Sequence, residues 1–331
     1  MSDHRILDKL LSDLTLSIEQ FLRIVARAPR TYKKFTIAKK NGERRSIAQP
    51  ARETKYVQNW LIGNVFDRLP IHKSATAYTK GASIKNNAFL HSTMPYIVKL
   101  DFKNFFPSIL IGDVEAHLSR YCTDLSAQEL KYISMLSCFD DQGKTCLSVG
   151  SPASPILSNS ILFQFDTLVF DWAKANGFIY TRYADDLTFS TSVRGASSLV
   201  LPKVLEFLAG LEYPRIILNE KKTIHLSKKS SRRITGLIIS NDGKVSLGRD
   251  RKREISVMVH KHLLGLLCAD DLFKLQGLLG FAQDVEPLFL SRLRAKYGTD
   301  ALRDLLAMRA PPKDKIKPAK KRKILIPVPR Q

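Results

Sequence analysis

Apolar residues recur every three or four positions along much of the chain, and this period predicts amphipathic helices. The first stretch covers 5–27, as one helix or two short ones, and the next covers 52–68 and stops before Pro70. The same spacing predicts helices over 111–120, 126–138, 156–176, 196–210, 250–267, 270–281 and 286–307. The last third of the chain is therefore predicted to be mainly helical.

Short runs rich in β-branched and aromatic residues predict strands between these helices. Residues 32–37 and 45–49 flank the turn-like Lys40-Asn41-Gly42 and predict a β-hairpin. Tyr96–Asp101 reads as a buried strand that ends in an aspartate, and 178–183 and 187–190 flank a tight acidic turn. Further strands are predicted near 215–218 and 233–240. Together these patterns predict an α+β body with a β-rich centre.

The charge of the chain indicates what kind of partner it binds. The 331-residue chain has 53 Lys and Arg against 31 Asp and Glu, a formal net charge of +22. Residues 1–100 carry +11, residues 101–200 carry −4 and residues 201–331 carry +15. Basic flanks suit the phosphates of a nucleic acid, and an acidic centre suits a site that holds cations. A solubility surface alone would not need so large an excess of one sign.

The cysteines and the apolar runs indicate the cellular compartment of the protein. The four cysteines form no C-x-x-C pair and show no disulfide-framework spacing, which predicts reduced thiols. The N-terminus lacks the basic and apolar regions of a signal peptide, and no run reaches the roughly 18 apolar residues of a membrane span. The sequence therefore predicts a cytoplasmic protein that does not associate with membranes.

Three aspartates fall at predicted strand ends in the acidic centre: Asp101 and the adjacent pair Asp185 and Asp186. Like charges held close together are costly unless a cation neutralises them. Two Mg²⁺ ions on such carboxylates can clamp the attacking and leaving oxygens of a phosphoryl displacement. With a polyanionic partner, the pattern indicates nucleotidyl transfer or phosphodiester cleavage, whereas an acidic pair alone also fits an ordinary polar turn.

The residues around these aspartates resemble the motifs of reverse transcriptases. Residues 98–108 (VKLDFKNFFPS) and 183–186 (YADD) match the paired catalytic motifs, and 150–159 (GSPASPILSN) resembles the segment between them. Residues 87–91 (NAFLH) match the N-A-x-x-H box of the retron subgroup of bacterial reverse transcriptases, and 234–237 (ITGL) is close to its V-T-G box. The resemblance covers most of the chain.

The resemblance implies an α+β right-hand polymerase architecture with fingers, a β-sheet palm and a mainly helical thumb. Residues 1–95 would form an N-terminal helix and the fingers, and 96–240 would form the palm, with fingers insertions between its motifs. Residues 241–310 would form the thumb. Residues 311–331, rich in Lys and Pro, would form a basic flexible tail.

The resemblance also implies a catalytic set. Asp101, Asp185 and Asp186 would hold two Mg²⁺ ions, for which Mn²⁺ can substitute, and the main-chain carbonyl of Phe102 would complete the ligands. Lys222 would donate a proton to the leaving pyrophosphate, although lysine clusters are commonly just solvated.

A second set would bind the incoming dNTP. Arg44 and Arg45 would clamp its triphosphate, because guanidinium groups suit bidentate phosphate contacts, while a solvated hairpin face is the alternative for one of them. Phe106 would be a steric gate against a ribose 2′-OH, and Gly150 would lie at the nucleotide. Val149 stands where the family normally has glutamine, which leaves open how the enzyme orders its nucleotide and template.

A third set would contact the template, the primer or the RNA. His91 serves structure or RNA recognition, because no second His or Cys lies at metal-ligand spacing. The full set is Tyr183, Asn87, His91, Thr235, Gly236, Arg251, Lys252 and Arg253.

The function implied is that of a retron reverse transcriptase. Such an enzyme would use dNTPs to copy a cognate noncoding RNA (msr-msd) into msDNA, starting from the 2′-OH of a guanosine, as part of antiphage defence with a separate effector protein. One alternative is another bacterial reverse transcriptase, of the diversity-generating or CRISPR-associated kind. The other is a catalytically idle RNA-binding scaffold of the same fold, against which the three intact aspartates argue.

Overall fold

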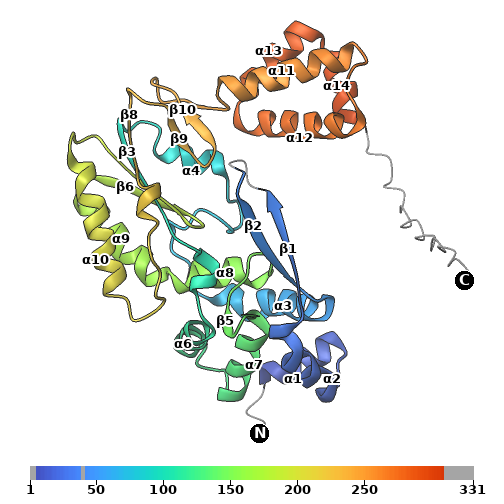
Figure 1. Ribbon diagram of the computed structural model, residues 1–331, viewed down its shortest axis with the longest axis vertical. Coiled ribbons are helices and arrows are strands. Elements are labelled where there is room, and N and C mark those ends of the chain that lie inside the picture. Colours follow the sequence, from blue (N-terminus) through green and yellow to red (C-terminus); the bar gives the residue numbers. More distant parts are fainter. Residues whose placement is uncertain (1–4, 39–41, 309–331) are drawn as a thin grey trace, which may run out of the picture. The chain divides into compact units, whose positions relative to one another are not determined.

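A computed structural model describes residues 5–38 and 42–308 and divides the chain into two compact units, Met1–Ser246 and Leu247–Gln331 (Figure 1). The first unit begins with α1 (Arg5–Leu14), α2 (Ile18–Arg27) and the 3₁₀ turn η1 (Ala28–Arg30). Two short helices form, because Thr15 leaves the helical conformation with a φ of +52° and Ser17 caps α2 through a capping box with Gln20. The predicted tail at 311–331 lies outside the described residues.

The predicted hairpin consists of β1 (Tyr32–Ala38) and β2 (Arg44–Pro50), paired antiparallel along their whole length. Lys40 and Asn41 of its predicted turn lie outside the described residues. The base of β2 is fixed to the rest of the unit, because the Ala48 N–H donates to the Val149 carbonyl at 2.9 Å. The three residues from Arg44 to Ser46 are exposed, so the hairpin is anchored at one end only.

An antiparallel sheet in the order β6-β7-β3-β8 forms the centre of this unit. Its strands are β3 (Tyr96–Asp101), β6 (Phe178–Tyr183), β7 (Asp186–Thr191) and β8 (Ile224–Ser227). The prediction of a strand at 215–218 was wrong. Ile216 and Leu218 are buried in alternation, as in a strand, but the segment forms only an isolated bridge, between Leu218 and Phe102. The fourth strand is β8 instead, which begins with two exposed residues and so lacks a strong apolar pattern.

Helices cover the sheet on the side of β6, where α9 (Phe163–Ala175) packs on that strand and α10 (Val200–Ala209) packs on α9 (Figure 1). The predicted helix over 156–176 is in fact α8 (Ala153–Ile161) and α9, with a break at Leu162. The remaining larger helices of this unit are α3 (Arg52–Asn64), α6 (Ile111–Tyr121) and α7 (Ala127–Ser137). They share one apolar core with the sheet.

Several short elements complete the first unit. They are η2 (Phe66–Arg68), α4 (Ile84–Leu90), α5 (Phe105–Ser108), β4 (Phe139–Asp141), β5 (Lys144–Cys146), η3 (Ala196–Leu199), η4 (Glu220–Lys222), β9 (Arg232–Ile234), β10 (Leu237–Ile239) and β11 (Val245–Ser246). Because β11 pairs with β10, the first unit continues to Ser246. Thr235, in the turn between β9 and β10, donates its hydroxyl to the Ile84 carbonyl at 3.2 Å. This contact joins the V-T-G box to the start of α4, the helix that carries most of the N-A-x-x-H box.

The described part of the second unit is helical: α11 (Arg249–Leu263), α12 (Ala269–Val285), α13 (Pro287–Tyr297) and α14 (Thr299–Ala307). The predicted helix over 286–307 is divided at Gly298, whose φ of +93° suits glycine and ends α13. No helix among the described residues is both long and apolar enough to cross a membrane. The mixture of an antiparallel sheet with helices confirms the predicted α+β class.

Candidate active site

The register of the central sheet brings the three predicted aspartates to one edge. Asp101, the last residue of β3, lies directly opposite Asp186, the first residue of β7. Asp185 precedes it in the tight turn that joins β6 to β7, and its carbonyl accepts a hydrogen bond from the Phe102 N–H at 3.0 Å. The pairing of two neighbouring strands therefore brings Asp101 beside carboxylates that lie 84 and 85 positions later in the sequence.

The turn that carries Asp185 has an unusual backbone. Ala184 has a φ of +57°, in the left-handed region that non-glycine residues rarely adopt. Its carbonyl accepts a hydrogen bond from the guanidinium of Arg182 at 3.1 Å, and its side chain is buried. Arg182 therefore holds the strained residue next to the predicted metal ligands, and it is a positioning residue that the sequence reasoning missed.

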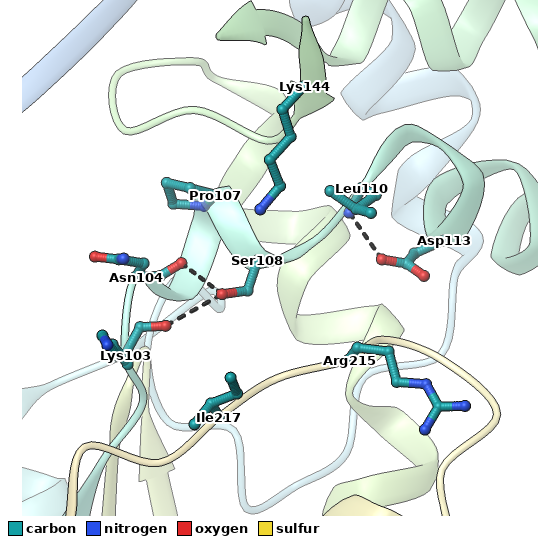
Figure 2. Close-up of a pocket in the computed structure, with 9 residues that line it drawn as sticks. All are labelled: Lys103, Asn104, Pro107, Ser108, Leu110, Asp113, Lys144, Arg215 and Ile217. Carbon is teal, nitrogen blue, oxygen red and sulfur yellow. Dashed lines mark hydrogen bonds between the residues drawn. The ribbon is translucent and has the colours of Figure 1, made fainter. Parts of the chain in front are cut away.

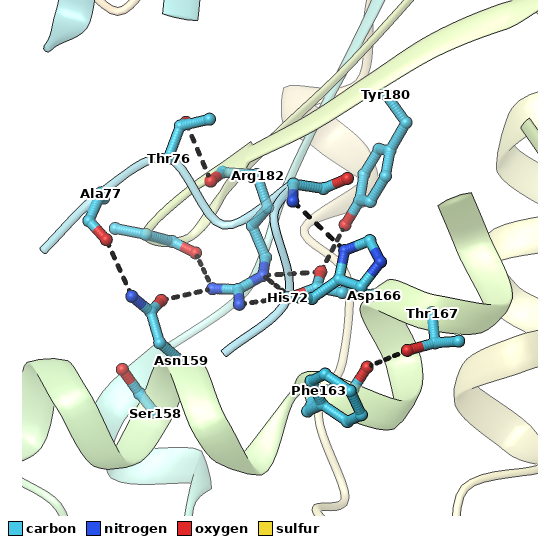
Figure 3. A network of polar contacts seen from close by, with 12 residues as sticks. His72, Thr76, Ala77, Ser158, Asn159, Phe163, Asp166, Thr167, Tyr180 and Arg182 are labelled. Atoms are coloured by element: carbon cyan, nitrogen blue, oxygen red, sulfur yellow. Dashed lines mark hydrogen bonds and ion pairs between the residues drawn. The ribbon is translucent and has the colours of Figure 1, made fainter. Parts of the chain in front are cut away.

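Arg182 belongs to a buried polar network (Figure 3). Its guanidinium forms an ion pair with Asp166 of α9 at 2.6 Å, and both side chains are fully buried. Asp166 also accepts from the Tyr180 hydroxyl at 2.7 Å, and Asn159 of α8 accepts from Arg182 at 3.1 Å. The network ties β6 to both helices, so the turn is held by charged groups in the core. The sequence signal that could have revealed this pair is a charged residue, Asp166, in an apolar helix and another, Arg182, in a buried strand.

The same network reaches the segment before α4. Asn159 donates to the Ala77 carbonyl at 2.7 Å, and the carbonyl of Arg182 accepts from the backbone N–H of Thr76 at 2.8 Å. These bonds fix residues 74–77 against β6, alongside an isolated parallel bridge between Ala75 and Arg182. Tyr78, the next residue, is thereby held close to the predicted site.

Burial and the repulsion of neighbouring carboxylates make Asp185 and Asp186 hard to ionise. Burial is the main cause that raises the pKa of Asp185, and the neighbouring charge of Asp101 adds to it. Burial likewise raises the pKa of Asp186 to about 6, with contributions from Asp185 and Asp101. Carboxylates that are brought together at this cost are typical of sites that hold a cation.

Lys222 supplies a positive charge in direct contact with Asp101. Its ammonium donates to Asp101 at 2.6 Å, and this bond raises the pKa of the lysine. Within residues 5–38 and 42–308, no three His, Cys, Asp or Glu side chains lie close enough to enclose an ion as they stand. The donor chemistry nevertheless fits Mg²⁺ or Mn²⁺, because all three side chains offer carboxylate oxygens and two of them have raised pKa values.

Aromatic rings gather behind Asp101. Phe102 and Phe105 are buried and stacked, with ring centroids 5.6 Å apart, whereas Phe106 is partly exposed. The ring of Phe106 lies 6.3 Å from that of Tyr78, which is half-exposed and has a φ of +62°. Strained, exposed aromatic residues are enriched at binding sites. Tyr78 therefore joins Phe106 as a candidate contact that the sequence reasoning missed.

Gly150 lies against the base of the hairpin. Its φ is +120°, and a Cβ there would come within 2.9 Å of the Ala48 carbonyl oxygen, so only glycine allows this approach. Arg44 and Arg45 lie on the exposed end of β2, opposite Ala38 and Ile37. The structure therefore joins Gly150 to the arginine-bearing strand, although the arginines themselves lie beyond the anchored part.

Two residues predicted to contact RNA lie in the interior. His91 is fully buried and contacts the hydroxyls of Ser190 on β7 at 2.7 Å and Thr181 on β6 at 2.8 Å. Burial lowers its pKa to about 3, so the ring is neutral. Asn87 is also buried and accepts from the Thr76 hydroxyl at 2.9 Å. We correct the predicted RNA contact for both, because neither side chain reaches the surface. His91, for which a structural role was the stated alternative, braces β6 and β7 beside the acidic turn, and Asn87 holds Thr76 in the segment before α4.

The other predicted RNA contacts lie in different environments. Tyr183 and Thr235 are partly exposed and Gly236 is exposed. In the second unit, Arg253 is exposed, whereas Lys252 is held in an ion pair with Glu286 at 2.5 Å. Arg251 covers the ring of Phe281, with 5.2 Å between the guanidinium carbon and the ring centroid. Arg253 is therefore the most accessible of the three α11 residues that were predicted to contact RNA.

Comparison with known proteins identifies the same family as the sequence motifs. The model of a family described as reverse transcriptase (RNA-dependent DNA polymerase) matches residues 37–239. The chain is 38% identical over 279 residues to the retron Ec83 reverse transcriptase of Escherichia coli, which covers 83% of this chain and 89% of that protein. It is 35% identical over 300 residues to the retron Ec73 reverse transcriptase of the same species, covering 87% and 94%.

More distant matches extend the comparison. The retron Mx162 reverse transcriptase of Myxococcus xanthus is 30% identical over 285 residues, covering 77% of this chain and 58% of that protein. Among solved structures, telomerase from Candida albicans in complex with a TWJ fragment of telomeric RNA has a TM-score of 0.47 and 15% identity. That match covers 86% of this chain and 60% of the telomerase, so the chain spans less than two thirds of its length.

Proposed function

This chain belongs to the reverse transcriptase (RNA-dependent DNA polymerase) family, with retron reverse transcriptases among its relatives, and we propose that it copies a cognate noncoding RNA into msDNA. The product would be a branched RNA–DNA molecule that starts from the 2′-OH of a guanosine. The register that sets Asp101 opposite Asp186, with Asp185 in the adjoining turn, is the observation that carries the proposal. Polymerisation of this kind needs carboxylates at one point beside a primer end.

The reverse transcriptase family generally uses divalent metal ions, and we assign two Mg²⁺ ions to the three aspartates. Asp101, Asp185 and Asp186 would hold them, with the carbonyl of Phe102 as a further ligand. When bound, such ions neutralise the charge on the reacting phosphate and lower the pKa of the primer hydroxyl. The pairing of Lys222 with Asp101 would give way as the ions bind, which frees the ammonium to protonate the leaving pyrophosphate.

The remaining site residues would orient the nucleotide and the strands. Arg44 and Arg45 would reach the triphosphate from the free end of the hairpin. Phe106, partly exposed, would exclude a 2′-OH, and Gly150 would let the backbone approach closely. Tyr183 would contact the template and primer end.

We assign the helical second unit to the thumb, and Met1–Ser246 to the fingers and palm. In the thumb, Arg253 is placed best for phosphate contact because it is exposed, and Arg251 and Lys252 would add to it after leaving their present partners. Thr235 and Gly236 would contact the noncoding RNA from the turn between β9 and β10. Because the template RNA and dNTPs are cytoplasmic in bacteria, we place the protein there, in antiphage defence with a separate effector protein.

The test is to express the chain together with the DNA that flanks its gene and to analyse nucleic acid for DNA linked to RNA. We expect wild type to give single-stranded DNA of defined length, freed from the RNA by debranching enzyme. Asp185→Ala/Asp186→Ala should give none. The matched control is Asp140→Ala/Asp141→Ala, because these adjacent aspartates also lie at a hairpin turn, where Asp141 pairs with the exposed Lys34.

Three outcomes separate the alternatives. If wild type and the Asp185/Asp186 variant gave the same product, the polymerase assignment would fail. Unbranched cDNA from wild type would point to a diversity-generating or CRISPR-associated enzyme. RNA binding without dNTP incorporation in Mg²⁺ would identify a catalytically idle scaffold.

A further inference from the structure

A pocket of about 390 Å³ lies beside the segment that follows Asp101 (Figure 2). Lys103, Lys144 and Arg215 line it, and they come from three separate segments: the turn between β3 and α5, the start of β5 and the loop between α10 and η4. All three are exposed, and none forms an ion pair with any residue in the described ranges. Unpaired cations that meet around a hollow favour an external anion.

The single carboxylate of the pocket does not neutralise these cations. Asp113 is turned toward the start of α6, where one of its oxygens accepts from the Leu110 N–H at 2.7 Å (Figure 2). Burial raises the pKa of this carboxyl. Because Asp113 caps the helix and pairs with no basic side chain, the lining keeps a net positive charge.

The floor of the pocket is fixed before any ligand arrives. The hydroxyl of Ser108 donates to the carbonyls of Lys103 at 3.1 Å and Asn104 at 2.9 Å. The Lys103 N–H in turn donates to the carbonyl of Ile217 at 2.8 Å. A preformed site avoids the cost of ordering its backbone when it binds.

Apolar surface adjoins the cations. Leu110 is 39% exposed and Ile217 is 67% exposed, and Pro107 also lines the pocket. Cations suit a phosphate, and an apolar wall suits the sugar or base attached to it. The volume is near the lower end of sites that hold small ligands, which is room for one nucleotide unit rather than a duplex.

We propose that this pocket binds one phosphodiester unit of an RNA strand, at a place separate from the three aspartates. The inference deepens the proposed function and rests on it for the identity of the strand. Pyrophosphate or a free mononucleotide has the same phosphate chemistry. The strand is favoured over pyrophosphate because pyrophosphate has no sugar or base that Leu110 and Ile217 could contact.

The test measures the affinity of the full chain for a short fluorescein-labelled single-stranded RNA by anisotropy, between roughly 50 and 200 mM KCl. The pocket variant is Lys103→Ala/Lys144→Ala/Arg215→Ala. The matched control is Arg23→Ala/Lys131→Ala/Lys174→Ala, which removes the same charge from exposed, unpaired positions on α2, α7 and α9. A parallel arm adds pyrophosphate or AMP as competitor to wild type and both variants.

We expect the pocket variant to bind RNA about ten-fold more weakly. The slope of log K against log salt should fall by about 0.7, since the pocket would neutralise one phosphate of a single strand. The control should keep the wild-type slope. Equal behaviour of the two variants would overturn the proposal, as would a pocket variant that keeps its RNA affinity but loses competition by pyrophosphate or AMP.

Extension of oligo(dT) on poly(rA) in Mg²⁺ is recorded separately. A wild-type protein that extends nothing would refute the proposed polymerase function, whereas the pocket is judged on the binding slopes alone. The two failures are therefore distinguishable.

Discussion

Replacement of Arg182 by methionine should be among the most destabilising single changes in the first unit. Methionine keeps an unbranched apolar stem but removes the guanidinium and its charge, which leaves Asp166 buried with no cation. The structure shows what is lost: three hydrogen bonds to Asp166 at 2.6 to 3.1 Å, and one each to Asn159 and the Ala184 carbonyl at 3.1 Å. Removing one partner of a buried pair costs about 3–5 kcal/mol.

Asp166→Asn should cost a similar amount, because it leaves the guanidinium without its counter-charge. The double variant Arg182→Met/Asp166→Asn should cost clearly less than the two single changes added together, since no isolated charge then stays in the core. A loss of about 3–5 kcal/mol is a large part of the 5–15 kcal/mol that stabilises an ordinary domain.

Urea unfolding followed by tryptophan fluorescence measures these free energies. Both tryptophans, Trp60 and Trp172, lie in the first unit, so the signal reports on the unit that holds the network. Lys103→Met is the control, because it makes the same kind of change at an exposed position. A cost below about 1 kcal/mol for Arg182→Met, or strictly additive single changes, would refute the reasoning.

Two further predictions concern His91 and Phe106. His91 has a folded pKa of about 3 against an ordinary 6.5, so its stabilising effect is complete above pH 6.5 and is lost as pH falls toward 3. Between pH 7 and pH 5 the loss of stability is about 2 kcal/mol. In urea titrations, His91→Gln should remove this part of the pH dependence, whereas the exposed control His225→Gln should not. An unchanged pH dependence in His91→Gln would contradict the buried, neutral ring. Phe106→Ala should raise the use of rNTPs relative to dNTPs by up to about 10²-fold in primer extension. The same change at the buried Phe105 should lower stability instead, and undiminished discrimination in Phe106→Ala would remove its role as the gate.

The sequence was sufficient to predict most elements of the first unit and the meeting of its aspartates. Short runs rich in β-branched and aromatic residues mark β3, β6 and β7, and the pairing of β6 with β7 follows once 183–186 is taken as a hairpin turn. The motifs themselves located Asp101, Asp185 and Asp186 without any geometry. Comparison with known proteins confirmed the family that these motifs indicated.

What the sequence could not supply was the direction of individual side chains. Asn87 and His91 read as polar residues in a family box, which suits either a surface or a braced interior. The hydroxyls of Ser190 and Thr181 decide for the interior at His91, and the hydroxyl of Thr76 does so at Asn87. Arg182 and Tyr78 were missed because their roles depend on contacts with residues far away in the sequence. The pocket of Lys103, Lys144 and Arg215 depends in the same way on three loops meeting.

The close approach at Gly150 has a mechanical consequence. The hairpin is fixed near Ala48 by the Val149 carbonyl, and Arg44 lies four residues further along the strand, about 13 Å at the usual rise. A rotation of about 20° at this pivot would carry the arginine through roughly 4 Å, enough to make or break a phosphate contact. The pivot itself uses the backbone at position 149 and the missing side chain at position 150. The side chain at position 149 can therefore change without weakening the attachment of the hairpin, whereas a side chain at position 150 would clash with the Ala48 carbonyl.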